Sequence, residues 1–515
     1  MEQPFDPLGS TRDRVTSQAK TIVWLIIVSA TILFLSSSIR HLLFQSAAFD
    51  LGYFDQALYL ISQGQPPIVS FWGFHFLGGH ADWILYLIAP LYKLYPSVFW
   101  LFGLQAIALA MGALPVWRLA QQAGVKANQA VAIAVAYLLY PLVFNINLFD
   151  FHPEVMALPV FLAVVLAARQ HQPLRFTLGV IFILGCRDAL SLTVAAMGLW
   201  LLLVEKKRLC GTIALVLGSV WFLIAVQIII PHFRPLGVEA VTRYAGFGNS
   251  VLDIAKNLIL QPGLVLQHLF TLPNLEYLCL LLLPLFWGLS SQHLAPLLAA
   301  VPQLAMNLLT VNQPQKDLVH QYSVPILPFL LLTAIASLAA NKSWIRSQRG
   351  IMVWSAIGFL ALAKFNFFGG FYLTKLDTWQ ATRDAIAQVK PATSVLTNPQ
   401  IAPHLTHRSN LQLLSNQFDV AMINEFNEVL LDSQHPGSNC SKECNDRVLD
   451  RLQQSPLFKL IYQRDGVYLF RKEQSENALA LLDNDERNGL HHQSKSLYRT
   501  AILFVSCLKR ISASS

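Results

Sequence analysis

Charged side chains are scarce in this 515-residue chain, at 13% of the residues, whereas soluble proteins carry about 25%. Hydrophobic residues make up 54%. A soluble protein of this size could not cover so apolar a surface, so that class is excluded and lipid is expected to cover it instead. The net charge is +8, but Lys and Arg stand between apolar runs rather than on one polar face. This placement excludes a nucleic-acid groove and is typical of residues that set membrane topology.

Cysteine is also rare, with six residues, and most of them lie within apolar runs as small core residues. Cys440 and Cys444 lie four residues apart in a polar region. They are either free or locally paired, because neighbours on one helix do not pair without distortion. Missing as well are a phosphate-cradling glycine loop, a metalloprotease helix and a nucleophile elbow. Any chemistry is therefore expected in residues beside the membrane spans.

Long apolar runs are abundant and predict about eleven transmembrane helices, since a full crossing needs about 20 residues. The first run is interpreted as an uncleaved helix. The run 174–186 is short and leads directly into Arg187-Asp188, which predicts a hairpin that stops partway with its charged tip in a cavity. The apolar runs cover approximately residues 21–38, 97–117, 129–146, 155–170, 174–186, 189–204, 209–230, 275–290, 294–311, 322–340 and 350–368.

The positions of Lys and Arg predict the orientation in a plasma (inner) membrane. If residues 1–20 are cytoplasmic, the inner loops hold most of the basic residues of the short loops. These are Arg118, Lys126, Arg169, Arg175, Lys206, Lys207, Arg208, Lys342, Arg346 and Arg349. An odd number of spans then places the loops 39–82 and 231–274, and everything after Phe368, outside the cytoplasm.

Composition changes after the last apolar run. Residues 371–472 predict a small α/β domain, with a helix over Thr382–Val389 and short strands at 394–397, 411–414 and 466–470. Residues 473–515 predict a disordered polar tail. The fold class is therefore an α-helical polytopic membrane domain, residues 21–370, followed by a small extracytoplasmic α/β domain.

The first predicted outer loop carries two acids and two histidines, at Asp50, Asp55, His75 and His80. The loop is rich in aromatic residues and glycine, so we expect it to pack back on the membrane domain. A half-buried carboxylate needs a partner or a chemical task. Asp50 is therefore a candidate functional acid, against the simpler interpretation of a solvated loop residue.

The second predicted outer loop places an acid, an imidazole and an acid within five residues, at Asp150, His152 and Glu154. These donors could hold a divalent cation such as Mg or Mn, or position an acceptor. The alternative is that the acids stabilise the N-terminus of the next helix.

Charges at membrane depth form a third candidate site. Arg187 and Asp188 must face protein or water, and they either neutralise each other or bind phosphate through the arginine fork. Arg243, His320 and Tyr322 lie in later outer loops, against the positive-inside trend, which favours anion binding over the alternative of surface charge.

Six stretches of the sequence resemble a family of uncharacterised multi-pass proteins of bacteria and archaea. They read FDLGYFDQALYLISQGQPP, GGHADWILYLIAPLYKLYPS, LQAIALAMGALPVWRLA, FDFHPEVMALPVFL, CRDALSLTVAAMGLWLL and HQYSVPILPFL, within roughly residues 20–470. That family resembles the C-type (GT-C) glycosyltransferases, which have many transmembrane helices, a catalytic acid in the first outer loop and often an outer C-terminal domain. Asp50 matches the loop acid, with Asp55 as a candidate helper. Many members have a second acid directly after the first, whereas Leu51 follows Asp50 here.

The resemblance implies a membrane glycosyltransferase with a polyprenyl-phosphate-linked sugar donor and an envelope acceptor. Asp50 would be the general base, and the Asp150–Glu154 cluster, with His75 and His80, would position the acceptor or a metal ion. Arg187, Asp188, Arg243, His320 and Tyr322 would contact the donor phosphate. Two alternatives remain: a transporter or flippase for a lipid or solute, although no inverted repeat is evident, and a non-catalytic protein of envelope assembly.

Overall fold

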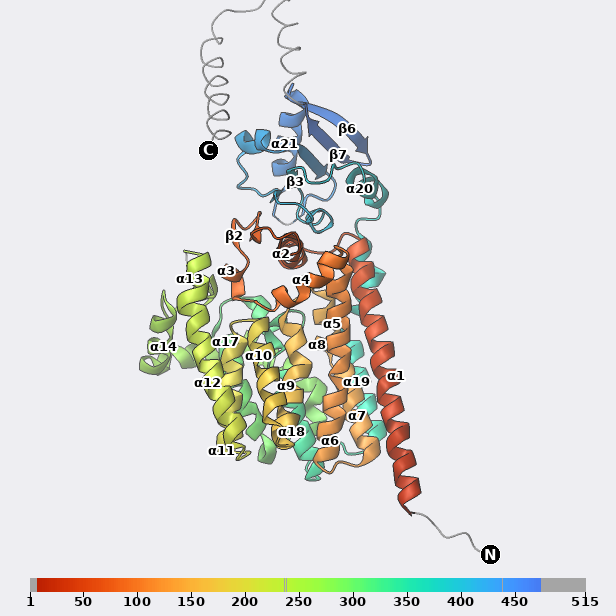
Figure 1. Ribbon diagram of the computed structural model, residues 1–515, viewed down its shortest axis with the longest axis vertical. Helices are drawn as coiled ribbons and strands as arrows, with labels where there is room; N and C mark the ends of the chain where they lie inside the picture. Colours follow the sequence, from red (N-terminus) through yellow and green to blue (C-terminus); the bar gives the residue numbers. More distant parts are fainter. Residues whose placement is uncertain (1–6, 236, 238, 438, 474–515) are drawn as a thin grey trace, which may run out of the picture.

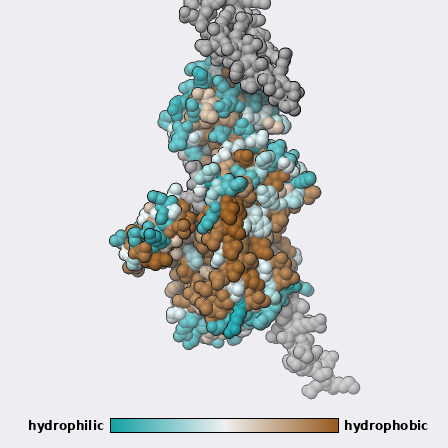
Figure 2. Space-filling view, turned by 60° about the vertical axis from the view of Figure 1, so that its left-hand side comes forward, coloured by the Kyte–Doolittle hydropathy of each residue, from teal (hydrophilic) through white to brown (hydrophobic). Residues whose placement is uncertain are grey.

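A bundle of membrane-type helices carries a small α/β domain on one end, which we call the domain side (Figure 1). The computed structural model describes residues 7–235, 237, 239–437 and 439–473. The predicted polar tail lies outside this part of the chain except for its first residue. In the space-filling view of Figure 2, hydrophobic side chains form a belt across the visible face of the bundle, between two hydrophilic ends. This surface matches a protein embedded in lipid.

The apolar runs form the helices of the bundle. These are α1 (Pro7–Leu42), α5 (Phe99–Met111), α6 (Ala113–Gln122), α7 (Ala127–Leu138), α8 (Pro141–Leu148), α9 (Glu154–Arg169), α10 (Pro173–Cys186), α11 (Leu190–Leu203), α12 (Arg208–Ile224), α13 (Ile230–Phe233), α16 (Leu272–Leu282), α17 (Val301–Leu309), α18 (Leu327–Ala339) and α19 (Gln348–Leu362). Proline at the first position starts α8 and α10, where its missing N–H breaks no bond.

Four helical segments of the described residues are long and apolar enough to cross a membrane, or six if two bent pairs each count as one span. The four are Ser17–Leu42, Phe99–Gln122, Ala127–Leu148 and Arg208–Phe233. The others are shorter, among them α10 and α11, which form the predicted hairpin around Arg187-Asp188. The helical membrane fold is thus found, while the count of eleven crossings stays a prediction.

Three glycines, Gly198, Gly211 and Gly218, let α11 and α12 pack closely against each other. A Cβ atom on Gly198 would lie 2.4 Å from the Leu215 backbone nitrogen, and one on Gly218 would lie 2.7 Å from that of Ala195. Small residues at a crossing allow such close backbone contact in lipid. The contact holds α11, and with it the charged tip that precedes it, against a neighbouring helix.

Short elements fill the domain side of the bundle between α1 and α5. They are a π-helical turn (Ala48–Gly52), α2 (Tyr53–Ser62), β1 (Ile68–Val69), β2 (Phe74–His75), α3 (Leu77–His80) and α4 (Leu85–Leu94). As predicted for this loop, most of their aromatic residues are buried or half-buried against the helices. A second excursion, α14 (Val251–Leu260) and α15 (Pro262–Leu269), projects from the side of the bundle (Figure 1).

The predicted α/β domain is built on a five-stranded sheet in the order β4-β3-β5-β7-β6. Its strands are β3 (Val395–Thr397), β4 (Leu411–Leu413), β5 (Glu428–Asp432), β6 (Phe458–Arg464) and β7 (Val467–Lys472), and its helices are α20 (Trp379–Ile386) and α21 (Lys442–Gln454). The strands β3, β4 and β5 are parallel, and β7 is antiparallel to both β5 and β6. Side chains of α20 and α21 enter two separate hydrophobic clusters, so the sheet has a core on each face.

The strand β5 was not predicted from the sequence, because this strand begins with Glu428 and ends with Asp432, and both acids are buried. Glu428 pairs with Arg471 of β7 at 2.6 Å, and Asp432 accepts a 2.9 Å hydrogen bond from the Thr378 hydroxyl. Buried carboxylates that have an ion-pair or hydrogen-bond partner of this kind can lie in a central strand.

Cys440 and Cys444 form a disulfide, with their Cα atoms 5.5 Å apart. Only Cys444 lies in α21, because the helix is capped by Ser441, whose side chain accepts from the Cys444 N–H. Cys440 therefore precedes the helix, and the pair avoids the unfavourable geometry expected for two residues of one helix.

The C-terminal domain rests on the short elements of the first loop. The Ser70 hydroxyl donates to the Leu411 carbonyl at 2.7 Å and accepts from the Leu411 N–H at 2.9 Å. The Gln56 amide donates to the Arg408 carbonyl at 2.9 Å and also binds Ser70. Side chains of the loop thus hydrogen-bond to the backbone of the domain and fix where it rests.

Asp55 is a buried acid inside this interface. Tyr92 donates to its Oδ1 at 2.5 Å, the Thr406 hydroxyl donates to Oδ2, and His407 Nε2 lies 3.2 Å from Oδ2. Burial lowers the pKa of His407, but the charge and hydrogen bond of Asp55 outweigh it and raise that pKa above its ordinary value. The carboxylate therefore joins the bundle to the domain.

Acidification is expected to loosen this interface through His404, whose ring stacks on His41 at 4.0 Å. Burial lowers the pKa of His404 to about 4, and the Lys375 cation adds to the effect. Because the unfolded value is about 6.5, the stability is present above pH 6.5 and is lost as the pH falls from there toward 4. We expect hydrogen exchange in residues 402–413, corrected for the chemical rate, to rise on the order of tenfold over this range.

The matched variants are His404→Gln, which should weaken this pH dependence, and His293→Gln, which lies outside the interface and should retain it in full. The pKa of His407 is raised rather than lowered by Asp55, so its titration does not weaken the interface as the pH falls. Exchange that is independent of pH in the wild-type protein would contradict the interpretation.

Candidate functional site

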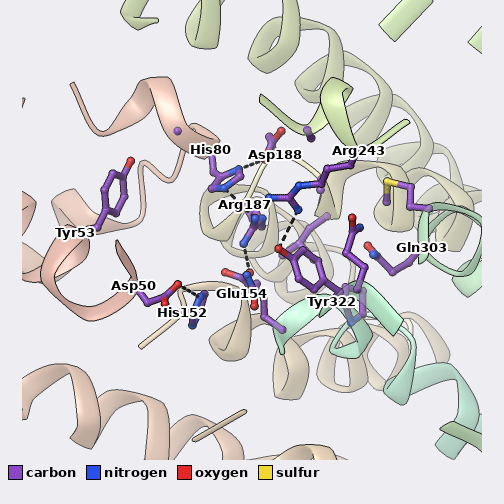
Figure 3. Close-up of a pocket in the computed structure, with 18 of the residues that line it drawn as sticks. Asp50, Tyr53, His80, His152, Glu154, Arg187, Asp188, Arg243, Gln303 and Tyr322 are labelled. Carbon is purple, nitrogen blue, oxygen red and sulfur yellow. Dashed lines mark hydrogen bonds and ion pairs between the residues drawn. The ribbon is translucent and has the colours of Figure 1, made fainter. Parts of the chain in front are cut away.

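A polar cavity of about 310 Å³ lies on the domain side of the bundle. Several segments far apart in sequence meet there, as Figure 3 shows: the π-helical turn, α3, the start of α9, the α10–α11 tip, the 3₁₀ turn Glu239–Tyr244, and α17. Predicted site residues on the wall are Asp50, His80, His152, Glu154, Arg187, Asp188, Arg243 and Tyr322. Asp55, His75, Asp150 and His320 do not line the cavity.

Asp50 lies at one end of the cavity, opposite Arg243 and Gln303 (Figure 3). Its carboxylate Oδ1 is 3.4 Å from His152 Nε2, and its side chain keeps 26% exposure. Burial lowers the pKa of His152, but the hydrogen bond to Asp50 and the charge of Glu154 outweigh it and raise the pKa above its ordinary value. The imidazole thus orients a carboxylate that still faces open space.

Arg187 pairs with Glu154 across the α9–α10 contact rather than with the adjacent Asp188. Its Nη2 lies 2.9 Å from His80 Nε2. Since the guanidinium can only donate, that ring nitrogen is the acceptor and the histidine hydrogen is on Nδ1, which lies 3.4 Å from Asp188. Burial and the Arg187 charge lower the pKa of His80, in agreement with a neutral ring. Glu154 is therefore the direct carboxylate partner of Arg187, and Asp188 contributes to it only through its nearby charge.

Arg243 enters the cavity from the side opposite Asp50. Its Nη1 donates to the Tyr322 hydroxyl at 2.9 Å, and the guanidinium lies 5.4 Å from the centre of that ring. Among the residues that the structure describes, no carboxylate forms an ion pair with it. A fixed guanidinium without an acidic partner is suited to bind an anion.

Asp150 faces away from the cavity. It has a left-handed backbone conformation (φ 81°), pairs with Arg40 of α1, and accepts from the Ala47 N–H at 2.8 Å. Gln105 donates to its carbonyl at 3.0 Å and accepts from the His152 N–H at 3.2 Å. Asp150 therefore holds the turn that presents Asp50, a positioning role that the sequence did not separate from metal binding.

His75 and His320 pack beside the site rather than in it. His75 stacks on Phe233 at 4.2 Å, and His320 Nδ1 lies 2.6 Å from Asp317 with its ring against Phe149. In the part of the chain that the structure describes, no group of three acids, histidines or cysteines is close enough to hold a metal ion. Because each donor of the Asp150–Glu154 cluster has a different partner, the cluster does not fit a single Mg or Mn ion.

A second hollow of about 380 Å³ adjoins the polar cavity and is almost wholly apolar. The two share the wall residues Asp188, Ala189, Ala240, Tyr244 and Met306. Its other residues include Leu192, Phe222, Val226, Val251, Ile254, Leu258, Pro302, Ala305 and Leu309. These apolar side chains carry no chemical signal in the sequence, and only the packing of α11, α12, α14 and α17 brings them together.

Comparisons with known proteins agree with this architecture. A family model described as Predicted membrane protein (DUF2079) matches residues 40–469. No curated protein matches the sequence significantly. ArnT from Cupriavidus metallidurans bound to undecaprenyl phosphate is similar in structure, with a TM-score of 0.52 and 12% identity, over 88% of this chain and 98% of that chain. ArnT from the same organism in the apo state gives a TM-score of 0.43 at 11% identity, over 89% and 99% of the chains. The expected GT-C-like fold in an uncharacterised membrane family is confirmed.

Proposed function

The chain belongs to the DUF2079 family of predicted membrane proteins, and we propose that it is a membrane glycosyltransferase that uses a polyprenyl-phosphate-linked sugar. The observation that carries this proposal is the shared wall between the polar cavity and the apolar hollow. A donor of this class has a charged phosphate next to a long hydrocarbon chain. The cavity offers guanidinium groups to the phosphate, and the hollow offers apolar side chains to the first isoprene units.

Undecaprenyl phosphate bound to a protein of the same fold supports the choice of lipid. The fold alone does not define an activity, so the argument depends on the residues of this chain. A lipid-dependent sugar transfer requires an acid, positive groups for the phosphate and a space for the lipid. The polar cavity holds an acid and two arginines, and the apolar hollow adjoins it.

In the proposed reaction, an acceptor hydroxyl oxygen attacks the anomeric carbon of the donor sugar. The bond from that carbon to the phosphate oxygen breaks, and its electron pair leaves with the phosphate. Asp50 accepts the hydroxyl proton as general base, oriented by His152. Arg243, held by Tyr322, stabilises the charge on the leaving phosphate, with Arg187 nearby in the same wall. No step is assigned to a metal ion, because the predicted donor cluster does not converge.

We place the domain side outside the cytoplasm, where an envelope acceptor would be found. The basic residues of the predicted inner loops support this orientation. Lys126 and Arg346 border one hollow at the loop joining α6 to α7, and Arg169 pairs with Glu205 at the loop between α11 and α12. Positive residues concentrated at the end opposite the domain fit the positive-inside rule.

The function is tested by mass spectrometry of envelope glycans and glycolipids from cells lacking the gene. We expect the loss of one sugar modification, restored by the wild-type chain and by Asp450→Asn, an exposed change in the C-terminal domain. Unchanged glycans would contradict the proposal. Movement of labelled lipid across proteoliposomes without a covalent product would instead favour the transporter or flippase.

A further inference from the structure

A third hollow, of about 430 Å³, opens at the Asp50 end of the polar cavity. Phe49 and Trp72 line both spaces, and Phe49 directly precedes Asp50. The apolar hollow adjoins the polar cavity elsewhere, around Asp188 and Tyr244. The apolar hollow, the polar cavity and this third hollow thus follow one another in that order. The candidate base Asp50 lies where the polar cavity meets the third hollow.

Aromatic rings dominate this third space, which we call the aromatic hollow, lined by Phe49, Phe71, Trp72, Gly73, Phe74, Arg234 and Pro235. The rings stand edge to face: Phe49 lies 5.9 Å from Trp72, and Trp72 lies 5.3 Å from Phe74. Arg234 lies 4.9 Å from the centre of the Phe74 ring. Edge-to-face packing holds the rings in fixed orientations around the hollow.

The turn between β1 and β2 presents these rings. Gly73 has φ of 76°, a left-handed conformation that favours glycine, and a Cβ atom there would contact nothing within 4 Å. Phe49 remains 42% exposed although it lies beside a candidate catalytic acid. One exposed and three half-buried aromatic side chains gathered around one open hollow indicate a binding surface.

The aromatic hollow belongs to the domain side rather than to the lipid-facing belt. Phe71 packs against the hydrophobic cluster of the C-terminal domain that contains Ala402 and Leu411. A hydrocarbon chain would gain little beside the Arg234 guanidinium, which keeps water close. The occupant is therefore a molecule with apolar faces and polar edges.

Resting on the proposed function, we propose that the aromatic hollow binds the acceptor as a saccharide. A pyranose ring has C–H groups on its faces, which pack on aromatic rings, and hydroxyl groups at its edge, which accept from an arginine. A sugar packed on Phe74 and Trp72 presents an edge hydroxyl toward the cavity that holds Asp50. This assigns separate entrances to the two substrates: the donor lipid from the apolar hollow and the saccharide from the aromatic hollow.

The test uses the full chain in lipid nanodiscs, with chitotetraose, mannotetraose and tetraglycine as probes in saturation-transfer NMR. At least one of the two saccharides is expected to bind, and tetraglycine is not. Phe74→Ala should weaken saccharide binding by about tenfold, Phe74→Trp should retain it, and undecaprenyl phosphate binding should be unchanged in both. The matched control is Phe270→Ala, an exposed aromatic that lines none of the three spaces.

Binding of tetraglycine but neither saccharide, binding of none of the probes, or saccharide binding unaffected by Phe74→Ala would each overturn this inference. If undecaprenyl phosphate binds normally in those cases, the proposed donor site stands and only the acceptor class is wrong. If undecaprenyl phosphate fails to bind the wild-type chain, the proposed function itself fails.

Discussion

Asp50→Asn is expected to lower the rate of sugar transfer by about 10²–10⁴-fold, the usual contribution of a general base. The amide keeps the shape of the carboxylate but cannot accept the acceptor proton. The rate is measured in membranes as transfer of a labelled sugar from its polyprenyl phosphate carrier. Undecaprenyl phosphate binding should be retained, because the proposed phosphate contact Arg243 lies at the other end of the cavity.

Asp450→Asn is the matched control, since it makes the same chemical change at an exposed position of α21. Full transfer by Asp50→Asn would rule out the base role. Loss of lipid binding together with transfer would show instead that Asp50 maintains the shape of the cavity.

Arg243→Gln is expected to lower transfer by about 10²–10³-fold, as removal of one group that stabilises developing charge does in other active sites. Undecaprenyl phosphate should also bind more weakly, because this guanidinium pairs with no described carboxylate and its charge is free to meet the phosphate. Tyr322→Phe removes only the 2.9 Å hydrogen bond that fixes the guanidinium, so its effect should be smaller.

Arg447→Gln, an exposed substitution in α21, is the control for loss of one positive charge. Unchanged transfer and lipid binding in Arg243→Gln would exclude its phosphate role. Arg187 is a less direct probe, because its removal leaves Glu154 buried and unpaired, which destabilises the fold itself.

The sequence predicted the helical membrane domain and the small α/β domain because both depend on local periodicity. It also selected Asp50, His152 and Arg187 from charge in apolar surroundings, and these side chains do meet in one cavity. It could not assign partners. Glu154 and Asp150 are four residues apart, yet one turns to Arg187 and the other to Arg40, a choice made by helix packing.

Asp55 illustrates the same limit. It lies five residues from Asp50 in the same predicted loop and was expected to assist catalysis, but its carboxylate is bound by Tyr92, Thr406 and His407. Two of those partners come from a domain some 350 residues later in the chain. The apolar and aromatic hollows were missed for a related reason, since aliphatic and aromatic residues are common in every membrane protein and only their three-dimensional grouping is distinctive.

The hydrogen bonds that Gln56 and Ser70 make with Arg408 and Leu411 have a consequence for how such proteins can diverge. The segment 48–75 and the C-terminal domain are distant in the gene but meet in one seam, where the side chain of Asp55 also contacts those of Thr406 and His407, so a change of one of these side chains leaves its partner without that contact. A chimera that exchanges the domain between two relatives must therefore carry the first loop with it. Recombination that separates the two segments would break the contacts between the first loop and the domain.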